Sequence, residues 1–246
     1  MKISYIIPVV NEIKTVEESI NQIINLNFEN KEIIIIDNAS TDGTQEILQK
    51  FIGCKNIKVI MRNKNLGFGA SIVKGFEEAN GEFIYIQYAD LEYDHLCSIK
   101  MLNLARETNA DLILGSRLKK FTSFKELINE VIKKPAYFAT IICTFLINIF
   151  YKKKFTDIIG GKFYKTESIK KIISYMESNS GMGQTFDFEL ISRICKEKLR
   201  VEEINIGYKA RKFTNAEKLK RVKERKIYFM HIFSAIFTII KIKLFN

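Results

Sequence analysis

Hydrophobic positions in the first 117 residues follow two alternating spacings. Short runs rich in Ile, Val, Phe and Tyr predict strands at Ile3–Val10, Glu32–Asp37, Ile57–Met61, Glu82–Tyr88 and Asp111–Leu114. Helical spacing between these runs predicts helices at Val16–Asn25, Thr44–Phe51, Ala70–Asn80 and Leu96–Thr108. Continuous apolar runs such as Ile33–Ile36 suit parallel strands that are covered on both faces. The alternation therefore predicts an α/β fold with a doubly wound, mostly parallel, Rossmann-like sheet.

The second half of the chain has a different pattern. Phe186–Lys198 is predicted as a helix and Val201–Tyr208 as a short strand. Lys133–Tyr151 and Ile227–Phe245 are strongly apolar, and Lys209–Lys226 between them carries nine Lys or Arg against two Glu.

This pattern predicts a division into two parts. A main domain is expected over residues 1–212, with a helical insertion at about 124–154. A basic and apolar helical extension is expected over residues 213–246.

The apolar segments are too short to predict a membrane span. Ala136–Tyr151 has 16 residues, about 24 Å as a helix, whereas roughly 20 residues are needed to cross a bilayer. With basic flanks such as Lys152–Lys154, helices lying among lipid headgroups fit better, and we expect peripheral membrane contact. Packing on the sheet is the plainer alternative, and the same helices could form a homodimer interface.

Composition narrows the classes of partner. The net charge of +11 calls for an anionic partner such as anionic lipid, phosphorylated substrate or nucleic acid. Because no nucleic-acid-binding signature is visible, nucleic acid is not expected. The four scattered cysteines form no CxxC pair and suggest reduced thiols, and the N-terminus has no secretory signal. We therefore expect a cytoplasmic protein at the inner face of the cell membrane.

Polar clusters follow three of the predicted strands, where doubly wound sheets bind ligands. They are Pro8–Glu12, Asp37–Thr44 and Gln87–Asp94. Asp37 can accept a hydrogen bond from a nucleobase or ribose, whereas Asp42 and its neighbours have the composition of an ordinary turn. If the extended path continues beyond the third strand, Asp90 and Glu92 project to the same side. Two such carboxylates are suitable ligands for Mg²⁺ or Mn²⁺ beside a diphosphate.

These motifs together resemble the family 2 glycosyltransferases of the GT-A fold. The matching segments are the P-x-x-N-E turn at Pro8–Glu12, the sequence EIIIIDNASTDGT at Glu32–Thr44, the R-N-x-N-x-G-x-G loop at Arg62–Gly69 and the G-S-R segment at Gly115–Arg117. Looser matches occur at Asp157–Lys162, Phe186–Glu189 and Tyr208–Arg211. The resemblance covers most of the chain and is closest to the dolichyl- and polyprenyl-phosphate-mannose-synthase-like branch.

The resemblance implies a set of site residues. The residues expected to bind the nucleotide sugar are Pro8, Asn11, Glu12, Asp37, Asn38, Asn65, Gly67, Ala89 and Arg117, of which Arg117 would contact the diphosphate. Asp90 would bind the metal, with Glu92 near it. Tyr88 stands where the family's D-x-D motif has its first Asp, so one of the usual metal ligands is absent, and basic groups such as Arg117 would carry more of the charge.

The function implied is sugar transfer from a nucleotide diphosphate sugar, with inversion, in bacterial cell-surface polysaccharide synthesis. The acceptor would be a polyprenyl phosphate or a glycan or lipid-linked hydroxyl. A hydroxyl needs a general base, for which Asp187 and Glu189 are candidates, and helix geometry turns only one of them toward the cleft. A phosphate acceptor needs no such base.

Two alternatives explain parts of the pattern. A catalytically impaired nucleotide-sugar-binding protein, or a membrane-surface scaffold, would account for Tyr88 in the D-x-D position. A dinucleotide-binding oxidoreductase would share the sheet, but no G-x-G-x-x-G follows the first strand. The resemblance assigns Asp90 to catalysis. Asp90→Ala therefore distinguishes the enzyme from the scaffold, because only the enzyme needs this side chain.

Overall fold

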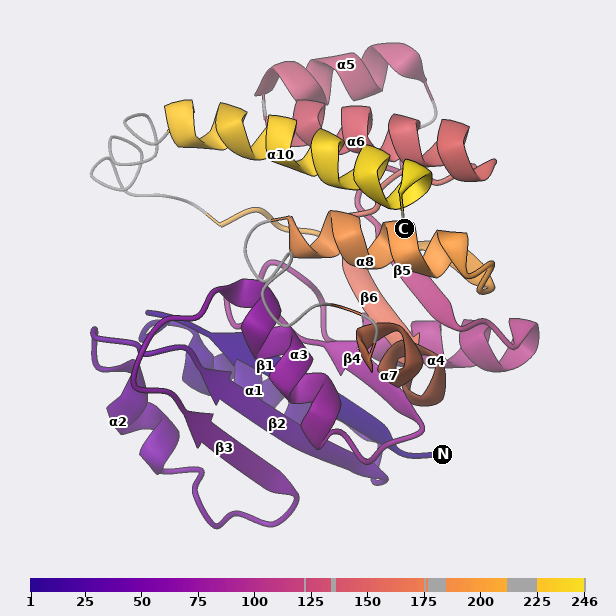
Figure 1. Cartoon of the computed structure of the whole chain (residues 1–246). Coiled ribbons are helices and arrows are strands. Elements are labelled where there is room, and N and C mark those ends of the chain that lie inside the picture. Colours follow the sequence, from indigo (N-terminus) through magenta and orange to yellow (C-terminus); the bar gives the residue numbers. More distant parts are fainter. Residues whose placement is uncertain (122, 134–135, 175, 177–184, 212–224, 246) are drawn as a thin grey trace.

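The computed structural model describes residues 1–121, 123–133, 136–174, 176, 185–211 and 225–245. Within these residues the centre of the molecule is one seven-stranded sheet in the order β3-β2-β1-β4-β6-β5-β7 (Figure 1). The strands are β1 (Ile3–Val9), β2 (Lys31–Asp37), β3 (Ile57–Met61), β4 (Phe83–Ile86), β5 (Leu112–Ser116), β6 (Gly161–Lys165) and β7 (Val201–Asn205). All pairs are parallel except those of β6, which runs antiparallel to both β4 and β5.

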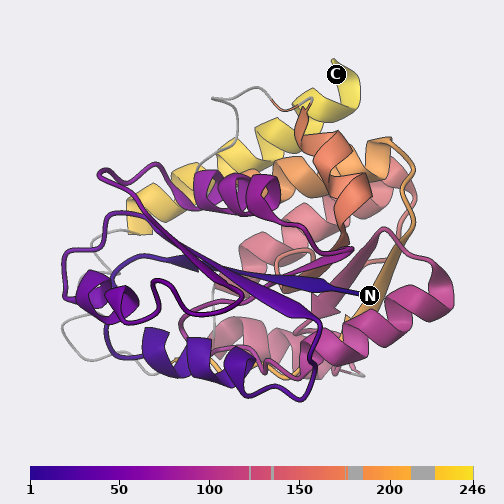
Figure 2. The ribbon, with the colours of Figure 1, turned by 90° about the horizontal axis from the view of Figure 1, so that it is seen from below.

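Helices cover both faces of this sheet (Figure 2). They are α1 (Val16–Ile24), α2 (Thr44–Gln49), α3 (Phe68–Glu78), α4 (Cys97–Thr108), α5 (Phe124–Lys133), α6 (Ala136–Tyr151), α7 (Thr166–Ser174), α8 (Phe186–Lys196) and α10 (Arg225–Leu244). Successive strand residues point to opposite faces, so one strand supplies two cores. Ile6 of β1 packs with α3 and α8, whereas Tyr5 and Ile7 pack with α1 and α4.

The predicted fold class is confirmed by this architecture. The first five predicted strands and four predicted helices are all present, with ends shifted by a few residues. β6 and α7 were not predicted. β6 reads Gly-Lys-Phe-Tyr-Lys, so its two lysines and its glycine hide the apolar alternation. Val201–Tyr208 was predicted as one strand, but β7 ends at Asn205 and Tyr208 forms only an isolated bridge with Tyr93.

A further helical layer lies beyond α8. α10 packs against α8 and α6, and Ala235 and Ile239 of α10 are buried there (Figure 1). α5 and α6 occupy the region where a helical insertion was expected. Most of the basic stretch Lys209–Lys226 lies outside the described residues, and the boundary at residue 212 stays a prediction. Among the helices described, we find none with the length and apolarity that crossing a bilayer requires.

Candidate functional site

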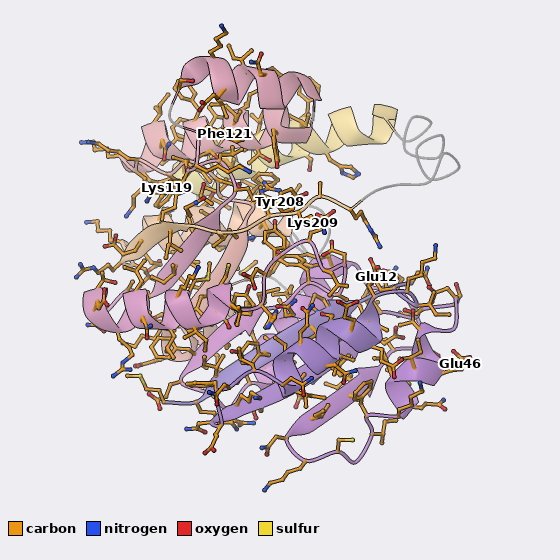
Figure 3. All side chains as sticks on the ribbon, turned by 180° about the vertical axis from the view of Figure 1, so that it is seen from behind. Glu12, Glu46, Lys119, Phe121, Tyr208 and Lys209 are labelled. Atoms are coloured by element: carbon orange, nitrogen blue, oxygen red, sulfur yellow. The ribbon has the colours of Figure 1, made fainter. Side chains whose placement is uncertain are left out.

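Polar side chains collect at one edge of the sheet. The carboxyl ends of the parallel strands β1, β2, β3, β4 and β5 meet there, and the antiparallel β6 begins there. Segments far apart in the sequence therefore approach one another at this edge; Figure 3 labels Glu12 and Tyr208 from two such segments. Doubly wound sheets bind their ligands in the same place.

Asp37 ends β2 and has an incomplete set of hydrogen bonds. Its side chain is fully buried, and Oδ2 accepts hydrogen bonds from Ser40 N at 3.2 Å and Gln45 Nε2 at 2.6 Å. Its Oδ1 is buried and has no partner. A buried carboxylate oxygen without a hydrogen-bond donor lowers the stability of the protein. This atom is therefore suited to accept a hydrogen bond from an N–H or O–H group of a ligand.

Arg62, just after β3 and beside Asp37, also has a buried side-chain atom without a hydrogen-bond partner. Its backbone N–H donates to the Asp37 carbonyl oxygen at 3.1 Å, and its Nη2 donates to the Ala70 carbonyl oxygen at 3.0 Å. Its Nη1 is buried without a partner. An unpaired acceptor and an unpaired donor therefore lie at the ends of neighbouring strands.

The predicted residues Asn11, Asn38 and Asn65 fasten the loops around Asp37. Asn11 has a φ of 54°, and its Oδ1 accepts a hydrogen bond from Thr41 N at 2.8 Å. Asn38 Nδ2 donates to Asn65 Oδ1 at 2.8 Å, and the same oxygen accepts from Gly67 N at 2.9 Å.

Two more residues predicted to bind the nucleotide sugar, Pro8 and Ala89, lie close by. Pro8 stands in β1 opposite Ile36 of β2, and Ala89 is buried in the loop after β4. The residues expected to bind the nucleotide are thus brought to the loops between the ends of β1, β2 and β4 and the start of α3.

A second cluster joins Glu12, Glu92 and the segment Tyr208–Arg211, which we call the strap. Arg211 Nη1 and Nη2 donate to the two Glu12 carboxylate oxygens at 3.1 and 2.7 Å. Glu92 Oε2 accepts from the Tyr208 hydroxyl at 2.8 Å, and its Oε1 accepts from Arg211 N at 2.9 Å. The strap therefore connects the end of β1 to the loop after β4.

Asp90 lies next to this cluster and differs from its neighbours. Burial raises the pKa of Asp90 to about 6, although the hydrogen bond from Glu92 N acts in the opposite direction. The nearby charges of Glu92 and Glu12 raise it further, and that of Arg211 lowers it. The extended path expected here is broken, because Leu91 has a φ of 60°. Asp90 is thus a carboxylate whose charged form is disfavoured mainly by burial.

The residues present fit a divalent metal only in part. Both Glu92 oxygens are engaged by the strap, and Tyr88 is stacked on Phe68, with ring centroids 6.0 Å apart and 7° between their planes. Burial raises the pKa of Tyr88 well above 10, so its phenol stays neutral and is a poor metal ligand. Among the described residues no three acidic, His or Cys side chains cluster as a metal site. Asp90 alone suits a metal that is otherwise held by a donor diphosphate.

Arg117, at the end of β5, forms a buried ion pair with Asp157. Nε and Nη2 donate to the carboxylate at 2.7 and 3.0 Å, and Arg117 N donates at 3.1 Å. Burial opposes ionisation of Asp157, but the charge and hydrogen bonds of Arg117 outweigh it and lower its pKa. The guanidinium lies 5.2 Å from the Tyr137 ring centroid and 5.4 Å from that of Tyr208. Arg117 thus stands between β5, α6 and the strap.

The two candidate bases on α8 have different surroundings. Asp187 Oδ1 lies 3.1 Å from Nζ of Lys162, a fully buried lysine at the start of β6. Glu189 is buried and pairs one helical turn further on with Arg193, whose Nε and Nη2 both lie 2.9 Å from its Oε1. Only Asp187 is held at the sheet edge that carries the other site residues.

Sequence reasoning assigned no role to four groups that complete this site. Arg62, Asp157 and Lys162 stood inside quoted motifs, but a motif does not show which side chain is left unpaired or buried. Tyr208 stood in another of the looser matches. Lys162 in particular reaches the site because β6 runs antiparallel, which sequence periodicity did not reveal.

Comparison with protein families identifies the class of protein, a sugar transferase. The model of the family "Glycosyl transferase family 2" matches residues 4–173. The chain belongs to this family.

Individual relatives are more distant. A dolichol-phosphate mannosyltransferase of Pyrococcus furiosus is 36% identical over 121 residues, covering 49% of this chain and 34% of the relative. A cholesterol galactosyltransferase of Borreliella burgdorferi is 33% identical over 136 residues, covering 55% and 38%. The alignments thus span little more than a third of the length of either relative.

A solved structure shares the fold across the whole chain. Glucosyl-3-phosphoglycerate synthase from Mycobacterium tuberculosis, solved with Mn²⁺, uridine diphosphate and phosphoglyceric acid, superposes with a TM-score of 0.66 at 15% identity. The match covers 100% of this chain and 79% of that one. At this identity the likeness describes the fold.

Proposed function

We propose that this chain transfers a sugar from a nucleotide diphosphate sugar to the phosphate group of a polyprenyl lipid. The observation that carries the donor part is the unpartnered Oδ1 of buried Asp37. A nucleobase N–H or ribose hydroxyl bound there would supply the missing donor. The unpaired Arg62 Nη1 could donate to a base carbonyl in the same way.

The chemistry needs positive charge beside the leaving diphosphate. An acceptor oxygen attacks the anomeric carbon, the bond from that carbon to the diphosphate oxygen breaks, and the electron pair stays with the diphosphate. Attack from the face opposite the leaving group inverts the configuration. Arg117 and Arg211 supply guanidinium groups suited to that growing charge. A metal bound by Asp90 and the diphosphate would neutralise part of the same charge.

The pairing of the carboxylates favours a phosphate acceptor. A hydroxyl acceptor needs a base, but Asp187 is paired with Lys162 and Glu189 with Arg193. A phosphate monoester is already anionic and needs no proton removed before attack. The name of one aligned relative, a dolichol-phosphate mannosyltransferase, agrees with a lipid phosphate acceptor, whereas the other, a cholesterol galactosyltransferase, names a lipid that carries a hydroxyl.

A donor screen tests this proposal first. Thermal unfolding is measured with UDP-, GDP-, CMP- and dTDP-sugars, each with and without Mn²⁺, and the stabilising donor is then incubated with undecaprenyl phosphate. We expect one nucleotide to raise the melting temperature and a glycosylated lipid phosphate to form. No stabilisation by any nucleotide sugar and no product would refute the proposal.

Substitutions on α8 test the nature of the acceptor. With a lipid phosphate, Asp187→Asn and Glu189→Gln should each retain substantial turnover. A loss of about a thousandfold or more in either would indicate a base and a hydroxyl acceptor. Because Asp187→Asn leaves buried Lys162 without its counter-charge, the double variant Lys162→Met/Asp187→Asn serves as the control for misfolding.

One observation favours a second candidate, a nucleotide-sugar-binding protein with impaired catalysis. Tyr88 occupies the first D-x-D position, and the strap engages Glu92. In an enzyme, Asp90→Ala should abolish transfer and leave the melting temperature unchanged. A wild-type chain that binds a nucleotide sugar, yet transfers to neither lipid phosphate nor glycan, would support the second candidate.

A further inference from the structure

An apolar groove of about 430 Å³ lies beside the proposed site, in the outer helical layer. One wall is formed by the segment after β5 and the start of α5, and the other by α6 and the segment before Asp157. The lining includes Leu118, Phe121, Leu127, Ile141, Phe145 and Phe155. Its volume falls within the range of small-molecule pockets, roughly 300–1,000 Å³.

The groove lies next to the Arg117–Asp157 ion pair, because residues adjacent to both partners in the chain line it. Leu118, the first residue of one wall, directly follows Arg117, and Thr156 of the other wall directly precedes Asp157. α6 reaches both places, because it carries Tyr137 over the Arg117 guanidinium and Ile141 in the groove. In Figure 3, Lys119 and Phe121 lie on the side of the α5 and α6 helices, with Tyr208 of the strap between them and Glu12.

Two lysines border this apolar surface. Lys119 lines the groove, and its Nζ donates to the Glu203 carbonyl oxygen at 2.6 Å. Lys120 is exposed, and its Nζ lies 5.1 Å from the Phe121 ring centroid. A groove lined mainly by apolar side chains, with two lysines at its border and Arg117 directly before Leu118 in the chain, complements an amphiphile with an anionic head.

We propose that this groove binds the hydrocarbon chain of the acceptor lipid and directs its phosphate toward Arg117. This inference rests on the proposed function and adds to it a location and a chain-length dependence. Each methylene removed from water strengthens binding. Affinity should therefore rise with chain length until the groove is filled.

Blocking the groove provides the test. Ile141 is half-exposed and lines it, so Ile141→Trp should fill the space. Ile149→Trp is the matched control, because Ile149 is exposed on the same helix and is not part of the lining. The acceptors are farnesyl phosphate, with three isoprene units, and dimethylallyl phosphate, with one.

We expect Ile141→Trp to raise the KM for farnesyl phosphate about tenfold or more, since several methylenes lose their contacts. The KM for dimethylallyl phosphate and the affinity for the nucleotide sugar should stay unchanged, and Ile149→Trp should behave as wild type. An equal effect on both acceptors, or none on either, would overturn the groove assignment. Leu127→Gln, which makes the opposite wall polar, replaces Ile141→Trp if that variant does not fold.

Calorimetric titration of farnesyl phosphate in the absence of donor separates this inference from the proposed function. If the wild type binds farnesyl phosphate, Ile141→Trp weakens that binding, and the wild type transfers no sugar, the groove assignment stands and the proposed function is refuted. Transfer to farnesyl phosphate that is insensitive to both groove variants would keep the enzyme and refute the groove.

Discussion

At the scale of single residues, most buried charges near the site are paired with opposite charges. Arg117 is held by Asp157 and Lys162 by Asp187, because an unpaired charge in a protein interior is costly. Asp37 differs, since one of its buried oxygens has no donor. Carboxylates thus hold Arg117 and Lys162 in place, whereas Asp37 keeps one oxygen that can accept a hydrogen bond from a ligand.

The unpaired oxygen leads to a prediction about donor binding. Asp37→Asn should weaken binding of the preferred nucleotide sugar about 10- to 100-fold, because hydrogen bonds to charged groups contribute about 1.5–3 kcal/mol. Isothermal titration calorimetry measures the change. Glu46→Gln, an exposed change on the adjacent helix α2, should leave the affinity intact. Equal affinities of the wild type and Asp37→Asn would show that Asp37 does not contact the donor.

The buried pair at Arg117 leads to a prediction about stability. Asp157→Asn should lower the free energy of unfolding at pH 7 by about 3–5 kcal/mol, because it leaves Arg117 without a counter-charge. The pKa of Asp157 is lowered in the folded protein, so its contribution is present above its unfolded pKa of about 3.9. It is lost as the pH falls through the folded value.

Urea unfolding at a series of pH values checks this sign. The stability difference between the wild type and Asp157→Asn should be constant near neutrality and narrow at acid pH. A gap that widens as the pH falls would contradict the assignment.

At the scale of elements, the antiparallel strand β6 shapes the site. It inserts between β4 and β5 and brings Lys162 to the edge where the parallel strands end. Its entry requires the backbone just before β6 to approach β5 closely. A Cβ atom at Gly160 would overlap the Gly115 carbonyl oxygen, so a residue with a side chain does not fit there without movement of the backbone.

This close approach predicts that Gly160→Ala destabilises the fold. Forcing a methyl group against backbone should cost about 1–3 kcal/mol, measured by denaturant unfolding. Gly207→Ala is the control, because its nearest neighbour, Asp94 Cβ, is at an ordinary 3.7 Å. Similar stability losses in both variants would show that contact with Gly115 is not the cause.

At the scale of the whole molecule, the two ends of the sheet serve different parts of the proposed reaction. The side of β1, β2 and β3 carries Asp37 and Arg62, which we propose bind the nucleotide sugar. On the other side, α5 and α6 line the groove, and α10 packs on α6. Phe233 and Phe237 of α10 are 70% and 68% exposed. The chain has a net charge of +11, and exposed phenylalanines on such a protein suit contact with an anionic bilayer.

Membrane contact is tested by sedimentation with vesicles. The wild type should bind phosphatidylglycerol vesicles more strongly than phosphatidylcholine vesicles, and salt should weaken binding. Phe233→Ser/Phe237→Ser should reduce the partition coefficient about tenfold or more, since each buried Phe contributes about 1.5–3 kcal/mol. Ile52→Ser, an exposed apolar change after α2, should have no effect. Vesicle binding that is unaffected by the double substitution would exclude α10 as the contact.

The sequence by itself determined the alternating strands and helices of the first half, because each repeats a local hydrophobic period. It also located Asn11, Asp37 and Asp90, since these residues lie at or just after the ends of strands that meet at one edge. β6 could not be predicted from the sequence, because its position depends on pairing with two strands that are distant in the chain.

Only the tertiary structure decided which charges neutralise one another. It joined Arg117 to Asp157, Lys162 to Asp187 and Arg211 to Glu12, and it left Asp37 Oδ1 without a partner. The physical reason is that burial and pairing depend on contacts between residues distant in the chain, whereas the hydrophobic period of a strand or helix depends only on neighbouring residues.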